Sequence, residues 1–161
     1  MKNLTWQNPE QLFVAQELIN KVKSKCCGIK VKKTITDLKI SNSVTEISDY
    51  SFYGCDGIIN LTIPNSVTKI GAHAFEGCNG ITSFTIPESV TEIGDSAFSD
   101  CAALTTLYFL SVNPPAITNS FTNNQSMTLN VFVPHKALKT YQNAEEWKDL
   151  WNLHGFGNTT D

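Results

Sequence analysis

The chain has 161 residues, of which 41% are hydrophobic and 17% are charged, and this fits one folded domain better than a disordered tail. Its net charge is -3, all twelve basic residues are lysines, and no apolar run approaches the roughly 20 residues of a membrane helix. Arginine is the usual residue for paired hydrogen bonds to phosphate and guanine, so its absence argues against a nucleic-acid reader and a phosphate enzyme. The absence of a long apolar run argues against a membrane-inserted protein.

The first 34 residues are predicted to form an N-terminal helical cap. Within residues 9–25 the apolar positions recur at intervals of three and four, as on one face of an amphipathic helix. These positions are Leu12, Ala15, Ile19, Val22 and Cys26. Asn8 and Pro9 supply an N-cap and a first-turn proline, and Gly28 suits the C-terminal end of the helix.

A lysine-rich stretch overlaps the end of this helix at residues 21–33 and contains the adjacent cysteines Cys26 and Cys27. Residues 1–36 carry a net charge of +5 (seven Lys, two Glu), and the remainder carries -8 (five Lys, thirteen Asp and Glu). Two interpretations stay open for the cysteines. Either Cys26 packs on the first coil and Cys27 is partly exposed, or the protein is thiol-active or metal-handling and uses the Cys26–Cys27 pair, with Cys27 as a reactive thiol acidified by lysines. The lysines form a solvated face, or they attract an anionic surface such as the acidic part of another copy.

From residue 38 the sequence repeats with a period of 23 residues and without gaps. The three units are LKISNSVTEISDYSFYGCDGIIN (38–60), LTIPNSVTKIGAHAFEGCNGITS (61–83) and FTIPESVTEIGDSAFSDCAALTT (84–106). Short repeats of this length bury their apolar positions by stacking on one another. We therefore predict an α/β repeat fold: a leucine-rich-repeat solenoid of about four coils over residues 35–133, with a parallel strand ladder.

Each unit is predicted to contain a strand, a corner and a short helical turn. In ITSFTIP the apolar residues alternate with polar ones, and Pro87 ends the strand. The helical turn would carry Phe98 and Cys101. Phenylalanine recurs in register and is predicted to form the spine of the core, at Phe52, Phe75, Phe98 and Phe121. The column of Tyr50, His73 and Ser96 is variable, and we expect it to be exposed.

The fourth unit departs from the pattern over residues 107–130, before the strand resumes at residues 131–134. Residues 134–161 are predicted to form a C-terminal helical cap with helices at 135–141 and 144–151, so that the chain is a single structural domain. Trp147, Leu150 and Trp151 would then cover the last coil.

The unit FTIPESVTEIGDSAFSDC, with its neighbour LTIPNSVTKIGAHAFEGC, resembles the BspA-like leucine-rich repeat family, and the tail from Pro114 to Trp151 looks like that of Bacteroides-type members. The resemblance covers about residues 35–151. It implies a curved solenoid without catalysis and a role in attachment or protein–protein contact. It also implies a secreted or surface location, whereas the lack of a signal sequence and the free thiols predict a cytoplasmic protein if Met1 is the native start.

The outward residues of the strand ladder are the predicted binding surface for a protein partner. The candidate residues are Asn60, Thr62, Ser83, Thr85, Thr106, Tyr108 and Phe132. Tyr108 and Phe132 are favoured because aromatic residues are enriched at interface hot spots. Phe132 packing under the C-terminal helix, and a structural spacer with no partner of its own, remain alternatives.

No catalytic set, cofactor motif or metal-ligand spacing is apparent. Cys55, Cys78 and Cys101 lie at the repeat spacing, which is typical of a buried column, and His73, His135 and His154 fall in unrelated columns. We expect no enzyme, no cofactor and no nucleic-acid partner, and we favour a monomer.

Overall fold

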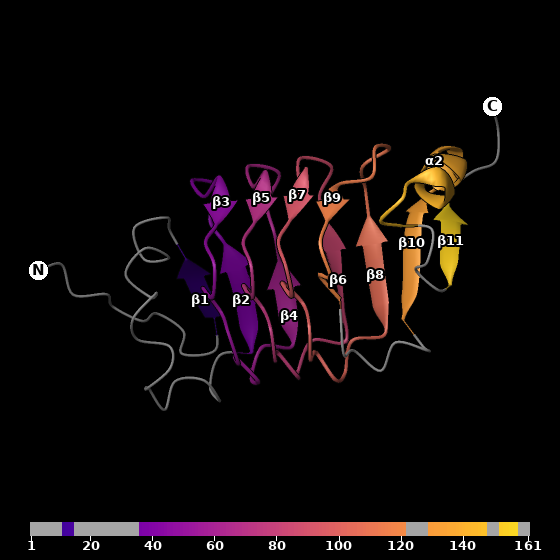
Figure 1. Cartoon of the computed structure of the whole chain (residues 1–161). Coiled ribbons are helices and arrows are strands. Elements are labelled where there is room, and N and C mark those ends of the chain that lie inside the picture. The colour runs from indigo at the N-terminus through magenta and orange to yellow at the C-terminus, as the bar shows by residue number, and fades with distance from the viewer. Residues whose placement is uncertain (1–10, 15–35, 122–128, 148–151, 158–161) are drawn as a thin grey trace, which may run out of the picture.

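The computed structural model describes residues 11–14, 36–121, 129–147 and 152–157, and its coils stack side by side along one axis (Figure 1). Every strand pair in this part of the chain is parallel. The coils of residues 37–59, 60–82 and 83–105 each consist of a long strand, a corner, a two-residue strand and a turn segment that leads to the next long strand.

The long strands form one side of the solenoid. In spatial order they are β1 (Gln11–Val14), β2 (Asp37–Ile40), β4 (Asn60–Thr62), β6 (Ser83–Ile86), β8 (Thr106–Phe109), β10 (Asn130–Pro134) and β11 (Leu153–Phe156). The hydrogen-bonded sheets are β1-β2-β4 and β6-β8-β10-β11, and β4 lies beside β6. The register follows the repeat, since Phe84 pairs with Leu107 and Thr85 with Tyr108.

The short strands form a second parallel sheet at the corner of each coil. They are β3 (Glu46–Ile47), β5 (Lys69–Ile70), β7 (Glu92–Ile93) and β9 (Ala116–Ile117). The charged column of the repeat lies here, and Lys69 Nζ is 2.9 Å from Glu92 Oε1. Opposite charges on adjacent coils favour this register over one that would place carboxylates side by side.

The turn segments that follow the short strands are also joined coil to coil. The backbone N–H groups of Tyr50, Phe52 and Gly54 donate to the carbonyls of Ala72, Ala74 and Glu76 at 2.7–2.9 Å. We call this row of turn segments, residues 48–57, 71–80 and 94–103, the turn edge. Its residues form turns rather than the short helix expected around Phe98 and Cys101, because these inter-coil bonds take up backbone groups that a helix would pair internally.

The core is a stack of identical side chains. Phe52, Phe75, Phe98 and Phe121 are buried and follow one another with ring centroids 5.1, 5.1 and 5.7 Å apart. This spacing is close to the roughly 4.8 Å between neighbouring strands, so the predicted spine is confirmed.

The N-terminal helix predicted at residues 9–25 is wrong at residues 11–14, where β1 pairs in parallel with β2. The remainder of that predicted helix lies outside the described residues. The edge of a solenoid offers unpaired backbone groups, and a short apolar segment gains hydrogen bonds there as a strand. With β1 and β11 added to the ladder, the solenoid has about five turns rather than four.

The C-terminal part is helical only at its start. A 3-10 turn, η3 (His135–Ala137), leads into α2 (Leu138–Asn143), in agreement with the helix expected at residues 135–141. Residues 145–147 form a turn rather than the start of a second helix, and Leu153–Phe156 is a strand. Trp147 is buried against Phe109 at 4.8 Å, as expected for a residue over the last coil, whereas Leu150 and Trp151 lie outside the described residues.

Candidate binding surface

The outward side chains of the long strands form one continuous surface, which we call the long-strand face. Alternation along each strand creates it, because every buried residue is followed by one that points away from the core. β6 shows the pattern, with Phe84 and Ile86 buried and Ser83 and Thr85 exposed. The candidates Asn60, Thr62, Ser83, Thr85 and Tyr108 are exposed, and Thr106 and Phe132 are partly exposed.

The N-terminal half of the long-strand face is polar. Asn60 Nδ2 donates a hydrogen bond of 2.7 Å to Asp37 Oδ1 on the preceding coil. Thr62, Ser83 and Thr85 continue the surface with small hydroxyl side chains. From Asn60 to Thr106 the outward positions of the strands carry no formal charge, so a partner can approach without desolvating ions there.

The C-terminal half of this face is an aromatic stack. The Tyr108 and Phe132 rings lie 5.0 Å apart at 18°, and the Phe132 and His154 rings lie 5.0 Å apart at 28°. These three residues occupy the same register position on β8, β10 and β11. Phe132 therefore lies on the long-strand face, in the middle of the stack, rather than under the C-terminal helix.

Two residues that the sequence reasoning missed complete this end of the face. Phe156 of β11 meets Tyr108 edge to face, with ring centroids 6.2 Å apart at 76°. His154 is exposed, and its Nε2 lies 3.3 Å from Asn130 Oδ1. The only sequence signal for them is the alternation in LHGF (153–156), in which Leu153 takes the register position of Val131.

The stacked rings determine what this surface can recognise. Phe132 has a ring stacked on each face, so mainly its edge is left for a partner, together with the edge and hydroxyl of Tyr108, which Phe132 covers on one face. Ring edges carry the positive side of the aromatic quadrupole and attract carbonyl oxygens and the faces of other rings. Tyr108 is 37% exposed, and Leu110, which follows β8, is 42% exposed. The C-terminal half thus combines apolar contact area with few polar groups.

The buried cysteines belong to the core. Cys78 Sγ donates to the Phe52 carbonyl at 3.2 Å, and Cys101 Sγ donates to the Phe75 carbonyl at 3.3 Å. Burial raises the pKa of the Cys101 thiol to about 12, so that it is not a nucleophile near neutral pH. Cys26 and Cys27, the proposed reactive pair, lie outside the described residues.

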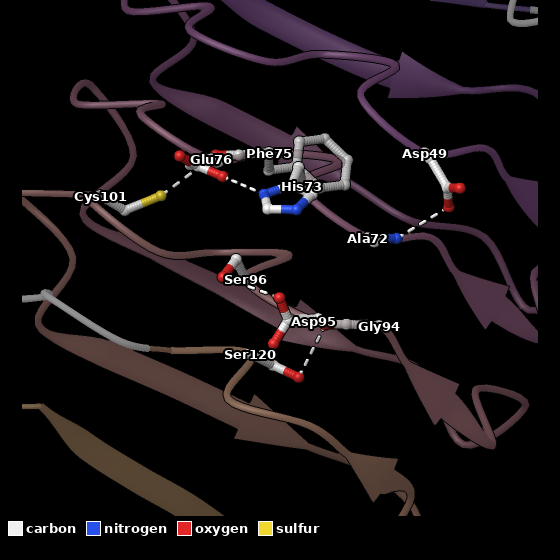
Figure 2. A network of polar contacts seen from close by, with 10 residues as sticks. All are labelled: Asp49, Ala72, His73, Phe75, Glu76, Gly94, Asp95, Ser96, Cys101 and Ser120. Atoms are coloured by element: carbon white, nitrogen blue, oxygen red, sulfur yellow. Dashed lines mark hydrogen bonds and ion pairs between the residues drawn. The ribbon is translucent and has the colours of Figure 1, made fainter.

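His73 is not fully exposed, in contrast to the expectation for its column. Its ring stacks on Tyr50 at 4.5 Å and 12°, and its Nδ1 contacts Glu76 Oε2 (Figure 2). Among the residues that the structure describes, no three His, Cys, Asp or Glu side chains are grouped so that they could hold a metal ion. Within the same ranges, no helix has the length and apolar character needed to cross a bilayer.

Comparisons with known proteins find one matching repeat family and similar solved structures. A family model described as BspA type leucine rich repeat region matches residues 23–144 in six copies. A solved leucine-rich repeat protein from Bacteroides ovatus is similar with a TM-score of 0.56 and 24% identity, covering 78% of this chain and 31% of that one. A leucine rich cell surface protein from Faecalibacterium prausnitzii gives a TM-score of 0.31 and 15% identity, covering 82% of this chain and 56% of that one.

No curated protein matches the sequence. The chain spans less than a third of the length of the Bacteroides ovatus protein, and at 24% identity this likeness shows the fold alone.

Proposed function

The chain belongs to the BspA-type leucine-rich repeat family, and from this premise we propose that it is a non-catalytic binding module of the adhesion type, which presents its long-strand face to a protein partner. The observation that carries the proposal is the stack of Tyr108, Phe132 and His154 at one end of an otherwise small and polar surface.

The aromatic half of the face is the proposed anchor. Aromatic residues contribute most at interfaces when they sit together and are surrounded by polar groups that exclude water. The stack fixes the Tyr108 and Phe132 rings, so a partner need not pay much side-chain entropy to order them. We place the largest contribution at these two residues.

The polar half of the face is the proposed rim. Asn60, Thr62, Ser83, Thr85 and Thr106 present amide and hydroxyl groups within one sheet surface. Such groups fix orientation through hydrogen bonds, each worth about 0.5–1.5 kcal/mol net. Single substitutions here should weaken binding less than a change in the stack.

The test replaces each aromatic residue by threonine, the residue that occupies the same column on β4 and β6. Tyr108→Thr and Phe132→Thr convert the stack into the surface already present at Thr85 and Thr62. A matched control, Ile59→Thr, changes an exposed apolar residue that lies just before β4. A partner is captured on the immobilised wild-type chain from the proteins of its natural surroundings, and its Kd is then measured against each variant.

The double variant Tyr108→Thr/Phe132→Thr should bind the partner at least about 30-fold more weakly than the wild type, as expected for loss of hot-spot residues, and Ile59→Thr should bind like the wild type. Equal affinity of the wild type, the double variant and Ile59→Thr would contradict the proposed surface. A structural spacer would capture no protein selectively, and that result would contradict the proposed function as a whole.

We also propose that the module acts outside the cytoplasm, as the family resemblance implies. Buried thiols such as that of Cys101 have little thiolate to oxidise, so a buried cysteine column does not require a reducing compartment. Protease treatment of intact source cells tests this: the protein should be cleaved under conditions that spare a cytoplasmic marker, and survival alongside that marker would contradict the proposal.

A further inference from the structure

A second aromatic surface lies on the turn edge, away from the outward residues of the long strands. We call Tyr50, Tyr53 and His73 the tyrosine patch. Tyr50 is 52% exposed and Tyr53 is 40% exposed, and their ring centroids are 5.9 Å apart. Tyr50 also stacks on His73 at 4.5 Å, so the three rings form one cluster across two adjacent coils.

The backbone under Tyr50 favours other residues than tyrosine. Tyr50 and His73 have φ values of +57° and +55°, and Ser96 and Asn119 take the equivalent position with φ values of +53° and +45°. Histidine and small polar residues such as asparagine tolerate this left-handed region, whereas a bulky tyrosine is uncommon there. The architecture therefore does not explain a tyrosine at position 50, and its exposure indicates that the core does not explain it either.

The surroundings of the patch are acidic. The three segments of the turn edge contain five carboxylates and no lysine, namely Asp49, Asp56, Glu76, Asp95 and Asp100. Asp49, His73, Glu76 and Asp95 lie along this row (Figure 2). Asp49 Oδ1 accepts the Ala72 N–H at 2.9 Å, which holds its carboxylate beside the coil that carries His73.

Lys69 on β5 offsets only part of this charge. Its ammonium group is 2.9 Å from Glu92 on the next coil and also attracts Glu46 and Asp49, so one lysine stands beside the five carboxylates of the turn edge.

His73 covers one face of Tyr50, so the opposite face and the Tyr53 ring are the surfaces that a ligand can approach. Tyrosine faces attract cations through the ring quadrupole, and carboxylates attract them through charge. Both properties of the patch therefore select the same class of ligand.

We propose that the tyrosine patch is a docking site for a lysine or arginine side chain carried by a basic segment of a partner protein. The cation lies against Tyr50 and Tyr53, and the carboxylates of Asp49 and Glu76 strengthen its attraction. This surface is distinct from the long-strand face, and the proposal does not depend on what binds there.

The test uses the whole chain and a fluorescein-labelled peptide of alternating lysine and serine, with a peptide of alternating glutamine and serine as its neutral control. Binding is followed by fluorescence anisotropy at about 20 mM and about 300 mM salt, because charge attraction weakens as the Debye length shortens. Tyr50→Leu and the double variant Tyr50→Leu/Tyr53→Leu remove the π faces and retain apolar bulk. Tyr108→Leu is the matched control on the long-strand face, and thermal unfolding confirms that each variant is folded.

The lysine peptide should bind and the neutral peptide should not. Tyr50→Leu should weaken binding about threefold and the double variant about tenfold, from roughly two- to fivefold for each cation–π contact. Tyr108→Leu should have no effect. The proposal is overturned if the wild type does not bind the lysine peptide, or if the tyrosine variants bind as the wild type does, since binding would then depend on net charge alone.

A further variant distinguishes a partner protein from the chain's own lysines. In it, the six lysines of residues 21–33 are replaced by glutamine. Unchanged affinity for the lysine peptide supports an external partner. A gain of about tenfold or more would show that the chain's own stretch competes for the patch, and would overturn the assignment to a partner protein.

Discussion

Replacing Phe75 with alanine should remove the central ring of the core and lower the free energy of unfolding by about 4–5 kcal/mol. Phe75 is fully buried, and its two faces are covered by Phe52 and Phe98, each at 5.1 Å and with interplanar angles of 14° and 5°. Phenylalanine-to-alanine changes in cores cost about 3–5 kcal/mol. We place Phe75 in the upper part of that range because each stacked pair adds about 0.5–1.5 kcal/mol beyond the buried area.

Urea unfolding of the whole chain, followed by circular dichroism, measures this effect, and thermal unfolding should show a fall in Tm of about 10–20 °C. Phe132→Ala is the matched control, since Phe132 also stacks between two rings but lies on the long-strand face and is partly exposed. It should cost less than about 2 kcal/mol. If Phe75→Ala costs no more than Phe132→Ala, the reasoning from a continuous phenylalanine spine is refuted.

Three other predictions concern the coil interfaces. Gly94→Ala should destabilise the protein by about 2 kcal/mol or more in the same urea assay, because a Cβ would lie 2.6 Å from the Ala72 backbone nitrogen; an unchanged midpoint would contradict this packing. Lys69→Glu would align three carboxylates with Glu46 and Glu92, so Tm should fall at low salt and largely recover at about 0.5 M salt; a salt-independent loss would point to packing instead. Burial raises the pKa of Cys101 from its ordinary value of 9.0 to about 12, so its stabilising contribution is complete below pH 9.0 and is lost as the pH rises toward 12. Denaturation midpoints from pH 8 to 11 should therefore fall more steeply for the wild type than for Cys101→Ala, and parallel curves would argue against the shift.

The repeating part of the fold was predictable because each side chain of the repeat meets its own copy. Ile47, Ile70 and Ile93 share one column of the sequence and one buried column of the structure. In such a solenoid local pattern and tertiary contact carry the same information, so register and core follow directly from the period.

The ends of the solenoid were harder because their conformation depends on an edge that the local sequence does not contain. Residues 11–14 fit a helical pattern, yet they pair with β2 as a strand. Residues 153–156 include Gly155, a weak strand former, but a Cβ at that position would lie 2.7 Å from His135 Nδ1, so the close approach of η3 requires glycine.

The candidate site was predictable in part for the same reason. The outward column through Thr85, Tyr108 and Phe132 follows from alternation and the repeat. His154 and Phe156 join it only through β11, and the tyrosine patch depends on a left-handed backbone position that hydrophobic periodicity does not reveal.

Cross-linking across the coil interface tests the central claim most directly, since every surface described above follows from the register of the long strands. Thr85→Cys with Tyr108→Cys places two thiols at directly paired positions on β6 and β8, within reach of a disulfide. Thr85→Cys with Thr106→Cys offsets them by two residues, beyond the Cα separation of about 7 Å that a disulfide tolerates. Mild oxidation and a non-reducing gel should show near-complete bridging of the first pair and little of the second. Equal bridging of both pairs, or preferential bridging of the offset pair, would contradict the equal parallel coils on which the account rests.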